Sequence, residues 1–478
     1  MNRRTKIVAT IGPASESPEM LEALLLAGVD VVRLNLSHGP IDEHIARLHL
    51  VRAAALAVGR PTAVLADLPG PKVRAGRFPE GGITLTVGQL LALKPGLEPS
   101  DAAVIRVDYP TLLQDVQVSD RIVLGDGGIT LRVFEVQAER LMANVETGGL
   151  VQGRPGVHLP SERLRLTAPT DEDLVLAAAM AAEGVDYIGV SFVREAGDMQ
   201  RVRAVTMPHS ARLVAKIETI PAVANLESIV AVSDAVMVAR GDLGIECPLE
   251  DVPHLQKKII RHCVEAGVAV ITATQMLESM IVSPAPTRAE VSDVANAVFD
   301  GTDAVMLSAE TAVGHDPVLV VTTMAQIALR AESEASYAQW GARLGRVQRS
   351  QWTDAGDRIT KAITHACAQA AADAGAQAIL CCTVSGRTAR AMARFRPMSR
   401  LIGLSPDMAT VRSMSLIWGV TPLHVDTYGS TDELVWFATE SAVRHNLVAP
   451  GDVVVVLAGA PDRPGGAATD VLRLVRVE

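Results

Sequence analysis

The stretch Leu213-Val-Ala-Lys-Ile-Glu-Thr219, together with Ala235-Val-Met-Val-Ala-Arg-Gly-Asp-Leu-Gly244, indicates the fold of this chain most strongly. Each stretch is a short apolar strand that runs directly into charged residues. If the two strands are neighbours, they bring together an ammonium at Lys216 and carboxylates at Glu218 and Asp242. Because the chain has seven lysines against thirty-seven arginines, a lysine at this place indicates a need for a compact point charge.

The same pattern of an apolar strand followed by polar residues recurs along the N-terminal part of the chain. Eight strands are expected, and polar or charged residues follow seven of them. The eight are Lys6–Ile11, Val29–Leu34, Ala63–Ala66, Tyr187–Val190, Leu213–Ala215, Ala235–Val238, Val268–Ile271 and Ala304–Leu307. Strand–helix units with their chemistry at the carboxyl ends of the strands are typical of a (β/α)₈ TIM barrel. A doubly wound open sheet is the alternative that the pattern leaves open.

Helical segments are expected between these strands. Thr170 and Asp173 have the spacing of a capping box, which predicts that a helix begins next to Thr170. The predicted helices are Ser17–Ala27, Asp42–Val58, Asp171–Glu183, Asp251–Ala266 and Thr287–Phe299.

One connection of the predicted barrel is too long to be a loop. About a hundred residues separate Asp67 from the helix at Asp171, and a structureless loop of that length is implausible in a compact domain. We therefore expect residues 71–158 to form an inserted β lid domain, a small β-barrel over the mouth of the larger one. The catalytic barrel then comprises residues 1–70 and 159–335, residues 336–350 form a connector, and residues 351–478 form a C-terminal α/β open-sheet domain.

The composition is that of a folded protein without affinity for nucleic acid. Hydrophobic residues make up 49% of the chain and charged residues 21%, so large cores can be buried. A net charge of −10 argues against general binding to nucleic acid or to an anionic membrane. No apolar run approaches the roughly 18 residues of a membrane span. The five cysteines show no Cys-x-x-Cys spacing, so we expect reduced, buried thiols in a cytoplasmic protein.

Lys216, Glu218 and Asp242 form the strongest functional signal. Two carboxylates can hold a hard divalent cation through oxygen, and a lysine beside that cation can neutralise a phosphoryl group or an enolate. Gly241 lets the backbone approach a ligand closely, and the N–H groups of Gly241 and Asp242 can receive a carboxylate. The alternative is a salt-bridged cluster on the barrel rim with no catalytic role.

Further polar residues follow neighbouring strands. Arg33 and Arg74 match phosphate oxygens bidentately beside a metal site, although either alone can be an ordinary exposed arginine. Thr274 follows the seventh strand, where it is either a helix cap or a hydroxyl near the substrate. Ser191 follows the fourth strand. The chain has no Gly-x-x-x-x-Gly-Lys-Ser/Thr motif, which excludes a P-loop phosphotransferase.

A second polar set follows the second and third strands. Asn35, Ser37 and Asp67 offer oxygen ligands of low total charge, which suit a monovalent cation or ordered water. Lys72 lies five residues beyond Asp67, within reach of the same place. The alternative for Lys72 is a solvated lysine at the hinge of the lid.

The C-terminal unit carries a strand–loop–helix element of its own. A helix start of this kind binds phosphate, and in a separate domain a second ligand is more natural than the substrate. The alternative is a helix cap without a ligand. The loop residues that we expect to contact such a ligand are Thr383, Ser385, Gly386, Arg387 and Thr388.

Several longer segments resemble signatures of the pyruvate kinase family, in the order in which that family has them. Among them are Thr5-Lys-Ile-Val-Ala-Thr-Ile-Gly-Pro-Ala-Ser15, Arg33-Leu-Asn-Leu-Ser-His-Gly39, Gly70-Pro-Lys-Val-Arg74, Ala239-Arg-Gly-Asp-Leu-Gly-Ile-Glu246 and Thr272-Ala-Thr-Gln-Met-Leu-Glu-Ser-Met280. The resemblance covers essentially the whole chain. It implies phosphoryl transfer from phosphoenolpyruvate to ADP, which gives pyruvate and ATP.

Carried over position by position, the resemblance implies a role for each site residue. Glu218 and Asp242 are expected to bind Mg²⁺, for which Mn²⁺ can substitute, and Lys216 to neutralise the phosphoryl group. The residues expected on the substrate side are Arg33, Ser191, Lys216, Gly241, Asp242 and Thr274. Those expected on the nucleotide side are Asn35, His38 and Arg74.

Two departures from the family pattern concern a monovalent cation. Many members have an acidic residue where this chain has Lys72 and a threonine where it has Leu68, and those members require K⁺. Here the Lys72 ammonium can take the place of K⁺ beside Asn35, Ser37 and Asp67. We therefore expect catalysis that does not require K⁺.

The resemblance also implies regulation and assembly. The loop at residues 383–388 is similar to the effector region of the family, so a phosphorylated sugar or nucleotide is the expected effector. The segment Ala458-Gly-Ala-Pro461 favours a sugar monophosphate or AMP over fructose 1,6-bisphosphate. Because the family is usually tetrameric, a homotetramer is expected.

Two other functions are compatible with the residues alone. A Mg²⁺-dependent lyase that makes a pyruvate enolate by carbon–carbon cleavage also pairs a metal with carboxylates and a basic residue. A metabolite sensor without catalysis is the third hypothesis, against which the complete set of Lys216, Glu218 and Asp242 argues.

Overall fold

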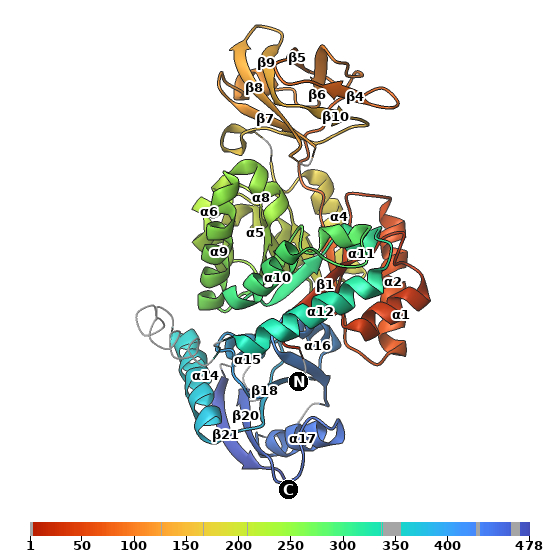
Figure 1. Ribbon diagram of the computed structural model, residues 1–478. Coiled ribbons are helices and arrows are strands. Elements are labelled where there is room, and N and C mark those ends of the chain that lie inside the picture. The colour runs from red at the N-terminus through yellow and green to blue at the C-terminus, as the bar shows by residue number, and fades with distance from the viewer. Residues whose placement is uncertain are drawn as a thin grey trace.

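The computed structural model describes residues 3–125, 127–165, 167–207, 209–335, 337, 355–426, 431–459 and 469–478. Figure 1 shows three parts in a row, with a central barrel between a small β unit and a C-terminal α/β unit. The connector expected at residues 336–350 lies outside the described residues, apart from Tyr337.

Eight parallel strands close the central barrel in the order β1-β16-β15-β14-β13-β12-β3-β2. The closed ring confirms the predicted (β/α)₈ barrel and excludes an open sheet for this part of the chain. Strand β13 runs past its predicted end and includes Lys216. The strands are β1 (Lys6–Thr10), β2 (Val31–Asn35), β3 (Ala63–Asp67), β12 (Tyr187–Val190), β13 (Arg212–Ile217), β14 (Ala235–Ala239), β15 (Ala269–Ala273) and β16 (Ala304–Leu307).

Helices surround the barrel, and the five predicted ones are confirmed to within one residue at each end. The capping box is also present, because Thr170 Oγ1 accepts from Asp173 N at 3.0 Å and Asp173 Oδ2 accepts from Thr170 N at 2.9 Å. No helix in the described parts of the chain is both long and apolar enough to cross a membrane. The barrel helices are α1 (Pro18–Ala27), α2 (Ile41–Ala57), α4 (Asp171–Ala182), α5 (Ala196–Thr206), α6 (Ile220–Ala224), α7 (Leu226–Ala231), α8 (Arg240–Glu246), α9 (Val252–Ala266), α10 (Arg288–Asp300), α11 (Ala309–Ala312) and α12 (Pro317–Glu334).

Alternating residues of each strand divide between two cores. In β13, Val214 packs in the cluster that fills the barrel interior, whereas Leu213 and Ala215 pack in the cluster between strands and helices. Both clusters are almost fully buried. Because the interior is filled, a site must lie at an end of the barrel, and in this fold it lies at the carboxyl ends of the strands.

The inserted unit has a core separate from that of the barrel. Its six-stranded sheet has the order β11-β7-β8-β9-β5-β6, and β10 pairs with β4 beside it. The strands are β4 (Ile83–Leu85), β5 (Leu90–Pro95), β6 (Val104–Val107), β7 (Arg121–Leu124), β8 (Ile129–Val136), β9 (Leu141–Thr147), β10 (Gly149–Val151) and β11 (Val157–His158), with one short helix, α3 (Leu112–Asp115). We call this unit the lid.

The C-terminal unit is an open five-stranded sheet of the order β19-β18-β17-β20-β21, in which only β21 is antiparallel to its neighbour. It confirms the predicted α/β open-sheet class for this part. Its strands are β17 (Ala378–Cys382), β18 (Arg400–Ser405), β19 (Val420–His424), β20 (Val453–Gly459) and β21 (Thr469–Arg476), and its helices are α14 (Ala355–Asp373), α15 (Arg387–Ala393), α16 (Met408–Ser413) and α17 (Thr431–Arg444).

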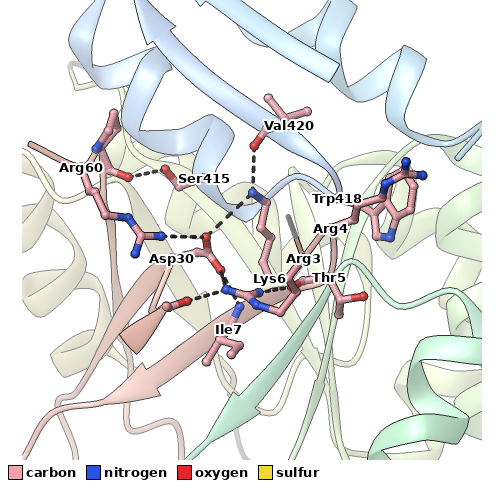
Figure 2. Close-up of polar contacts among 12 residues, drawn as sticks. Arg3, Arg4, Thr5, Lys6, Ile7, Asp30, Arg60, Ser415, Trp418 and Val420 are labelled. Carbon is pink, nitrogen blue, oxygen red and sulfur yellow. Dashed lines mark hydrogen bonds and ion pairs between the residues drawn. The ribbon is translucent and has the colours of Figure 1, made fainter. Parts of the chain in front are cut away.

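Figure 2 shows how the first residues of the chain join the barrel to the C-terminal unit. Asp30 forms ion pairs with Arg3 at 2.8 Å, and with Lys6 and Arg60 at 3.8 Å each. Lys6 Nζ also donates to the carbonyl oxygen of Val420 at 2.8 Å. These contacts lie at the amino ends of the strands, so the C-terminal unit covers the end of the barrel opposite to the lid (Figure 1).

Candidate active site

Lys216 lies at the centre of the polar groups at the carboxyl ends of the strands. Its Nζ is 2.9 Å from Glu218 Oε1 and 3.2 Å from Asp67 Oδ1, and it donates to Ser191 Oγ at 2.7 Å. Burial alone would lower the pKa of this lysine, but the carboxylates of Asp67 and Glu218 raise it above its ordinary value. The Lys216 ammonium is therefore a permanent positive charge in a nearly dry place.

Glu218 and Asp242 lie close enough for their charges to interact. Burial, together with the charge of Asp242, raises the pKa of Glu218 to about 7, against the opposite effect of Lys216. The backbone N–H of Phe192 donates to Glu218 Oε2 at 2.7 Å. A buried carboxylate at Glu218 and a half-buried one at Asp242 are a donor set that fits a divalent cation.

The protein supplies only part of the ligands that such a cation needs. Among the described residues, no group of three or more His, Cys, Asp and Glu side chains could hold a metal ion. Mg²⁺ differs from Ca²⁺ in that it usually takes one or two carboxylates and completes its octahedron with water and substrate oxygens. Glu218 and Asp242 fit that arrangement.

Arg33 and Lys216 approach the same acidic side chain. Arg33 Nε donates to Asp67 Oδ2 at 2.7 Å, and its Nη1 donates to Thr10 Oγ1 at 3.1 Å. Lys216 approaches the other oxygen of Asp67. These two cations lower the pKa of Asp67 and outweigh its burial. Both oxygens of Asp67 are therefore engaged by cations of the protein itself.

The second polar set is also brought together. Lys72 Nζ donates to Ser37 Oγ at 3.4 Å, and the Ser37 N–H donates to Asn35 Oδ1 at 3.3 Å. Desolvation and the charge of Lys216 lower the pKa of Lys72, while the carboxylates of Asp242, Glu218 and Asp67 oppose that change. Lys72 therefore lies beside Ser37 and feels the charges of the cluster, while its side chain is exposed to solvent, as the alternative of a hinge lysine predicts.

Thr274 follows β15 in an unusual backbone conformation, with φ at 73°. No described helix begins at Thr274, so it is not a helix cap. A Cβ on Gly241 would lie 2.8 Å from Thr274 Cγ2, which shows how closely the backbone at Gly241 approaches the Thr274 side chain. The pairing of Ala239 with Ala273 in neighbouring strands sets this approach.

Arg240 holds the turn that carries Thr274. Its Nε donates to the carbonyl oxygen of Ala273 at 3.0 Å and its Nη2 to that of Thr274 at 2.7 Å. Asp293 on α10 fixes the guanidinium at 2.7 Å. Left-handed backbone is strained for a β-branched residue, so such support is needed. Nothing in the sequence signals this role, because the partners come from other elements.

A cavity of about 290 Å³ lies between the barrel mouth and the lid. The residues that line it include Asp242, Thr219, His38, Lys72 and Arg74. Burial and the neighbouring cations lower the pKa of His38, so its imidazole is neutral near pH 7. The predicted nucleotide residues Arg74 and His38 thus share one cavity with a predicted metal ligand.

The predicted effector loop lies far from this cavity, at the start of α15. Gly386 has a φ of 78°, and the carbonyl oxygen of Ser385 accepts from Arg212 Nη2 at 3.1 Å. The Thr388 hydroxyl bonds to that of Thr469 at 2.8 Å, inside the domain. Of the segment at residues 458–461, the last two residues lie outside the described part of the chain.

Two family models match this chain. The model described as pyruvate kinase, barrel domain, matches residues 2–321, and the one described as pyruvate kinase, alpha/beta domain, matches residues 361–475. The chain belongs to the pyruvate kinase family. It is 43% identical to a pyruvate kinase of Geobacillus stearothermophilus over 96% of this chain and 78% of that one. It is 41% identical to a pyruvate kinase of Methylorubrum extorquens over 100% of this chain and 98% of that one.

The family assignment decides among the three hypotheses from the sequence. Pyruvate kinases are phosphotransferases, so the chain is an enzyme rather than a metabolite sensor, and its reaction is not carbon–carbon cleavage. Family members generally use Mg²⁺, in keeping with the Glu218 and Asp242 pair.

Proposed function

We propose that this chain transfers the phosphoryl group of phosphoenolpyruvate to ADP, the final step of glycolysis, by the site centred on Lys216. The observation that carries the proposal is the Lys216 ammonium, fixed 2.9 Å from Glu218 Oε1 and 3.2 Å from Asp67 Oδ1 at the barrel mouth. A buried cation held by fixed carboxylates is preorganised to neutralise a phosphoryl group in flight. Phosphoryl transfer depends mainly on such positioning and electrostatics.

Glu218 and Asp242 are the residues that would hold Mg²⁺, or Mn²⁺ in its place. When bound, the cation would supply Lewis-acid charge that stabilises the negative charge on the substrate. The chain itself supplies the orientation, because the Phe192 N–H fixes Glu218 and the first turn of α8 places Asp242. The cation would thus supply the Lewis-acid chemistry, and the protein orients the two carboxylates that would hold it.

We propose the remaining substrate contacts as follows. Arg33, held by Asp67 and Thr10, is positioned to grip the phosphate bidentately. The backbone N–H groups of Gly241 and Asp242, in the first turn of α8, would receive the substrate carboxylate. We place Thr274 and Ser191 around the enolate, and a water molecule bound to Thr274 is our proposed route for its protonation.

On the nucleotide side, we propose contacts from Arg74, His38 and Asn35. Arg74 lines the cavity, and its Nη1 donates to the carbonyl oxygen of Arg154 at 3.3 Å. A neutral His38 can either donate or accept a hydrogen bond from a nucleotide. ADP would then lie between the lid and the barrel.

The reaction is tested by measuring pyruvate with and without ADP. The purified protein is expected to form pyruvate from phosphoenolpyruvate only when both ADP and Mg²⁺ are present, with one ATP for each pyruvate. Pyruvate formation from an aldol donor without ADP would instead identify a lyase. If no pyruvate formed under any of these conditions, even with added effectors, the result would favour the hypothesis of a metabolite sensor without catalysis.

We further propose that Lys72 replaces K⁺. Its ammonium lies 3.4 Å from Ser37 Oγ, within the field of Asp242 and Asp67. A cation fixed by the chain makes an exchangeable one unnecessary. Turnover is therefore expected to be the same with and without KCl in sodium-free buffer.

The Lys72→Glu variant tests this substitution of charges. Its carboxylate is expected to lower turnover in K⁺-free buffer by at least about tenfold, since one lost electrostatic stabiliser typically costs more than that. Added KCl should restore much of the loss. The matched control Lys258→Glu, on the exposed surface of α9, should stay independent of K⁺. A wild-type enzyme strongly activated by KCl would contradict the proposal.

For regulation and assembly, we propose a phosphorylated sugar or nucleotide at the loop of residues 383–388 and a homotetramer. The loop is bonded to the strand that carries Lys216, because the Ser385 carbonyl oxygen accepts from Arg212, the first residue of β13. Activation by a panel of sugar monophosphates and AMP, together with the mass in solution, tests both points. The cytoplasm is the compartment that we predict from the reduced thiols.

A further inference from the structure

Glu246 is a half-buried acidic residue of the cavity to which the reaction described above assigns no role. It ends α8, the short helix that carries Asp242 in its first turn. Residues four apart lie on the same face of a helix, and Asp242 and Glu246 both line the cavity. Like charges at this spacing destabilise a helix, so the stability of α8 does not explain Glu246.

The partners of Glu246 all lie outside its own helix. Ser161 Oγ donates a hydrogen bond to Glu246 Oε2, and the backbone N–H of Ile220 donates to the same carboxylate. Ile220 begins α6, two residues after Glu218, and Ser161 begins the short 3₁₀ turn Ser161–Arg163 on the return from the lid. One carboxylate therefore joins both metal-ligand segments to the second lid connection.

The segment that contains Ser161 is bonded to the lid itself. Arg163 forms an ion pair with Asp120, and its Nε donates to the carbonyl oxygen of Asp115 at 3.2 Å. The backbone N–H of Arg165 donates to the Tyr109 hydroxyl at 3.0 Å. Because of these bonds, a shift of the lid would move Ser161 with it.

The first lid connection is fixed to the barrel instead. There the Gly70 N–H donates to Asp173 Oδ1 of α4 at 3.0 Å. Among the described residues, the hydrogen bond between Ser161 and Glu246 thus ties the second lid connection to α8, the helix of Asp242.

We infer that Glu246 is a positioning residue for phosphoryl transfer, which sets the lid, and the nucleotide beneath it, relative to Asp242 and Glu218. This inference rests on the proposed function. It adds a coupling between the two halves of the reaction: the metal-bound substrate lies on the barrel, while Arg74 approaches the nucleotide from the lid side. A displacement of about 1 Å between reacting groups can cost 10²-fold in rate, so a single misplaced hinge contact is enough to slow transfer.

The test compares kinetic constants of variants at both ends of this contact. Glu246→Ala is expected to lower kcat by about ten- to a hundredfold and to raise KM for ADP, while KM for phosphoenolpyruvate changes little. Glu246→Gln keeps an acceptor oxygen for Ser161 and should recover most of kcat. Glu250→Ala removes an exposed carboxylate just beyond α8 and should match the wild type.

A double-mutant cycle shows whether the effect passes through Ser161. If it does, Ser161→Ala in the Glu246→Ala background causes no further loss, although it slows the wild type. Additive losses, or a Glu246→Ala enzyme with wild-type kcat, would overturn the inference. The inference would also be overturned if Glu246→Ala lowered kcat/KM equally for ADP and phosphoenolpyruvate and Glu246→Gln did not restore it. Partial unfolding of the enzyme would produce that result.

Two features keep the outcomes separate. If Glu246→Ala does not fold, as judged by circular dichroism, then Ser161→Ala and Glu246→Gln still decide the question through their KM for ADP. If the wild type and Glu250→Ala form no pyruvate from phosphoenolpyruvate and ADP, the proposed function fails. If they do and the Glu246 and Ser161 variants equal them, only the coupling fails.

Discussion

Asp67 explains how two cations can face one substrate. Arg33 engages its Oδ2 and Lys216 approaches its Oδ1, and Asp67 is almost completely buried. Without this carboxylate, the guanidinium and the ammonium would repel each other in a place of low dielectric. The anion thus keeps in place the two charged groups that we propose to bind the phosphate.

The Asp67→Asn variant is expected to lose both stability and activity. Breaking a buried ion pair by removing one partner typically costs about 3–5 kcal/mol, since the other charge stays buried. A lower midpoint of thermal unfolding, together with a fall in kcat, would agree with this account. Asp171→Asn on the exposed first turn of α4 is the control. An unchanged midpoint would show that Asp67 does not hold the two cations.

Gly241→Ala tests the close approach of α8 to Thr274. The new Cβ would lie 2.8 Å from Thr274 Cγ2, so the strained turn must shift. We expect kcat to fall by about tenfold or more, since small displacements at reacting groups are expensive. At Gly244 the nearest side-chain atom to a new Cβ is 3.5 Å away, so Gly244→Ala should have wild-type kcat. Equal effects of the two substitutions would contradict the role of this contact.

At the residue scale, the sequence predicts the charged site residues better than the hydrogen bonds that hold site residues in place. Lys216, Glu218 and Asp242 stand next to recognisable strands, so their meeting was predictable. The support from Arg240 to Thr274, and that from Ser161 to Glu246, was not. Ser161 and Glu246 are 85 positions apart, and only the folded lid and barrel bring them together.

At the scale of elements, α4 combines helix capping with anchoring of the lid. Asp173 accepts from Thr170 N through one oxygen and from Gly70 N through the other. The capping box was predictable because both of its residues are local. The bond to Gly70 was not, since that residue lies on the far side of the inserted lid.

Substitutions at this cap should therefore differ in size. Thr170→Ala removes a helix cap, which typically costs about 1 kcal/mol. Asp173→Ala should lower the midpoint of thermal unfolding further, because it also frees the Gly70 N–H and loosens the first lid connection. The control is Asp171→Ala, because the side chain of Asp171 lies on the same turn and is fully exposed. A smaller effect for Asp173→Ala than for Thr170→Ala would contradict the anchoring role.

The lid shows where prediction of elements ends. Its position was predictable, because a connection of such length needs structure of its own. The order of its strands depends on pairing between distant segments, for which the sequence holds no local signal. Strand β5 (Leu90–Pro95) carries only a weak strand pattern of its own, because it ends in Lys94 and Pro95.

At the scale of the whole molecule, separate cores explain the arrangement of the three parts. The lid has its own hydrophobic cluster, whereas residues of the C-terminal unit such as Phe395 pack in the same cluster as the barrel helices. The buried ion pair of Arg396 with Asp303, at 2.9 Å, adds a polar contact to that junction. The C-terminal unit is thus built onto the barrel, and the lid is joined to it by two connections.

The cysteines give a test of these cores. All five are buried, and burial raises the pKa of Cys367 and Cys382 to about 12 and also raises that of Cys247, Cys263 and Cys381. Because the thiolate is the reactive form, the native protein should not react with Ellman's reagent at pH 8. The unfolded protein should release five equivalents. Rapid reaction of the native protein would contradict the packing.

The central claim is that the Lys216 ammonium neutralises the phosphoryl group during transfer. The most direct test is the rate of ADP-dependent pyruvate formation by Lys216→Met, compared with Lys258→Met on the exposed surface of α9. We predict a fall in kcat of about 10²–10³-fold for Lys216→Met, the usual result of removing one preorganised electrostatic group, and none for Lys258→Met. A Lys216→Met enzyme with the turnover of the wild type would contradict the account.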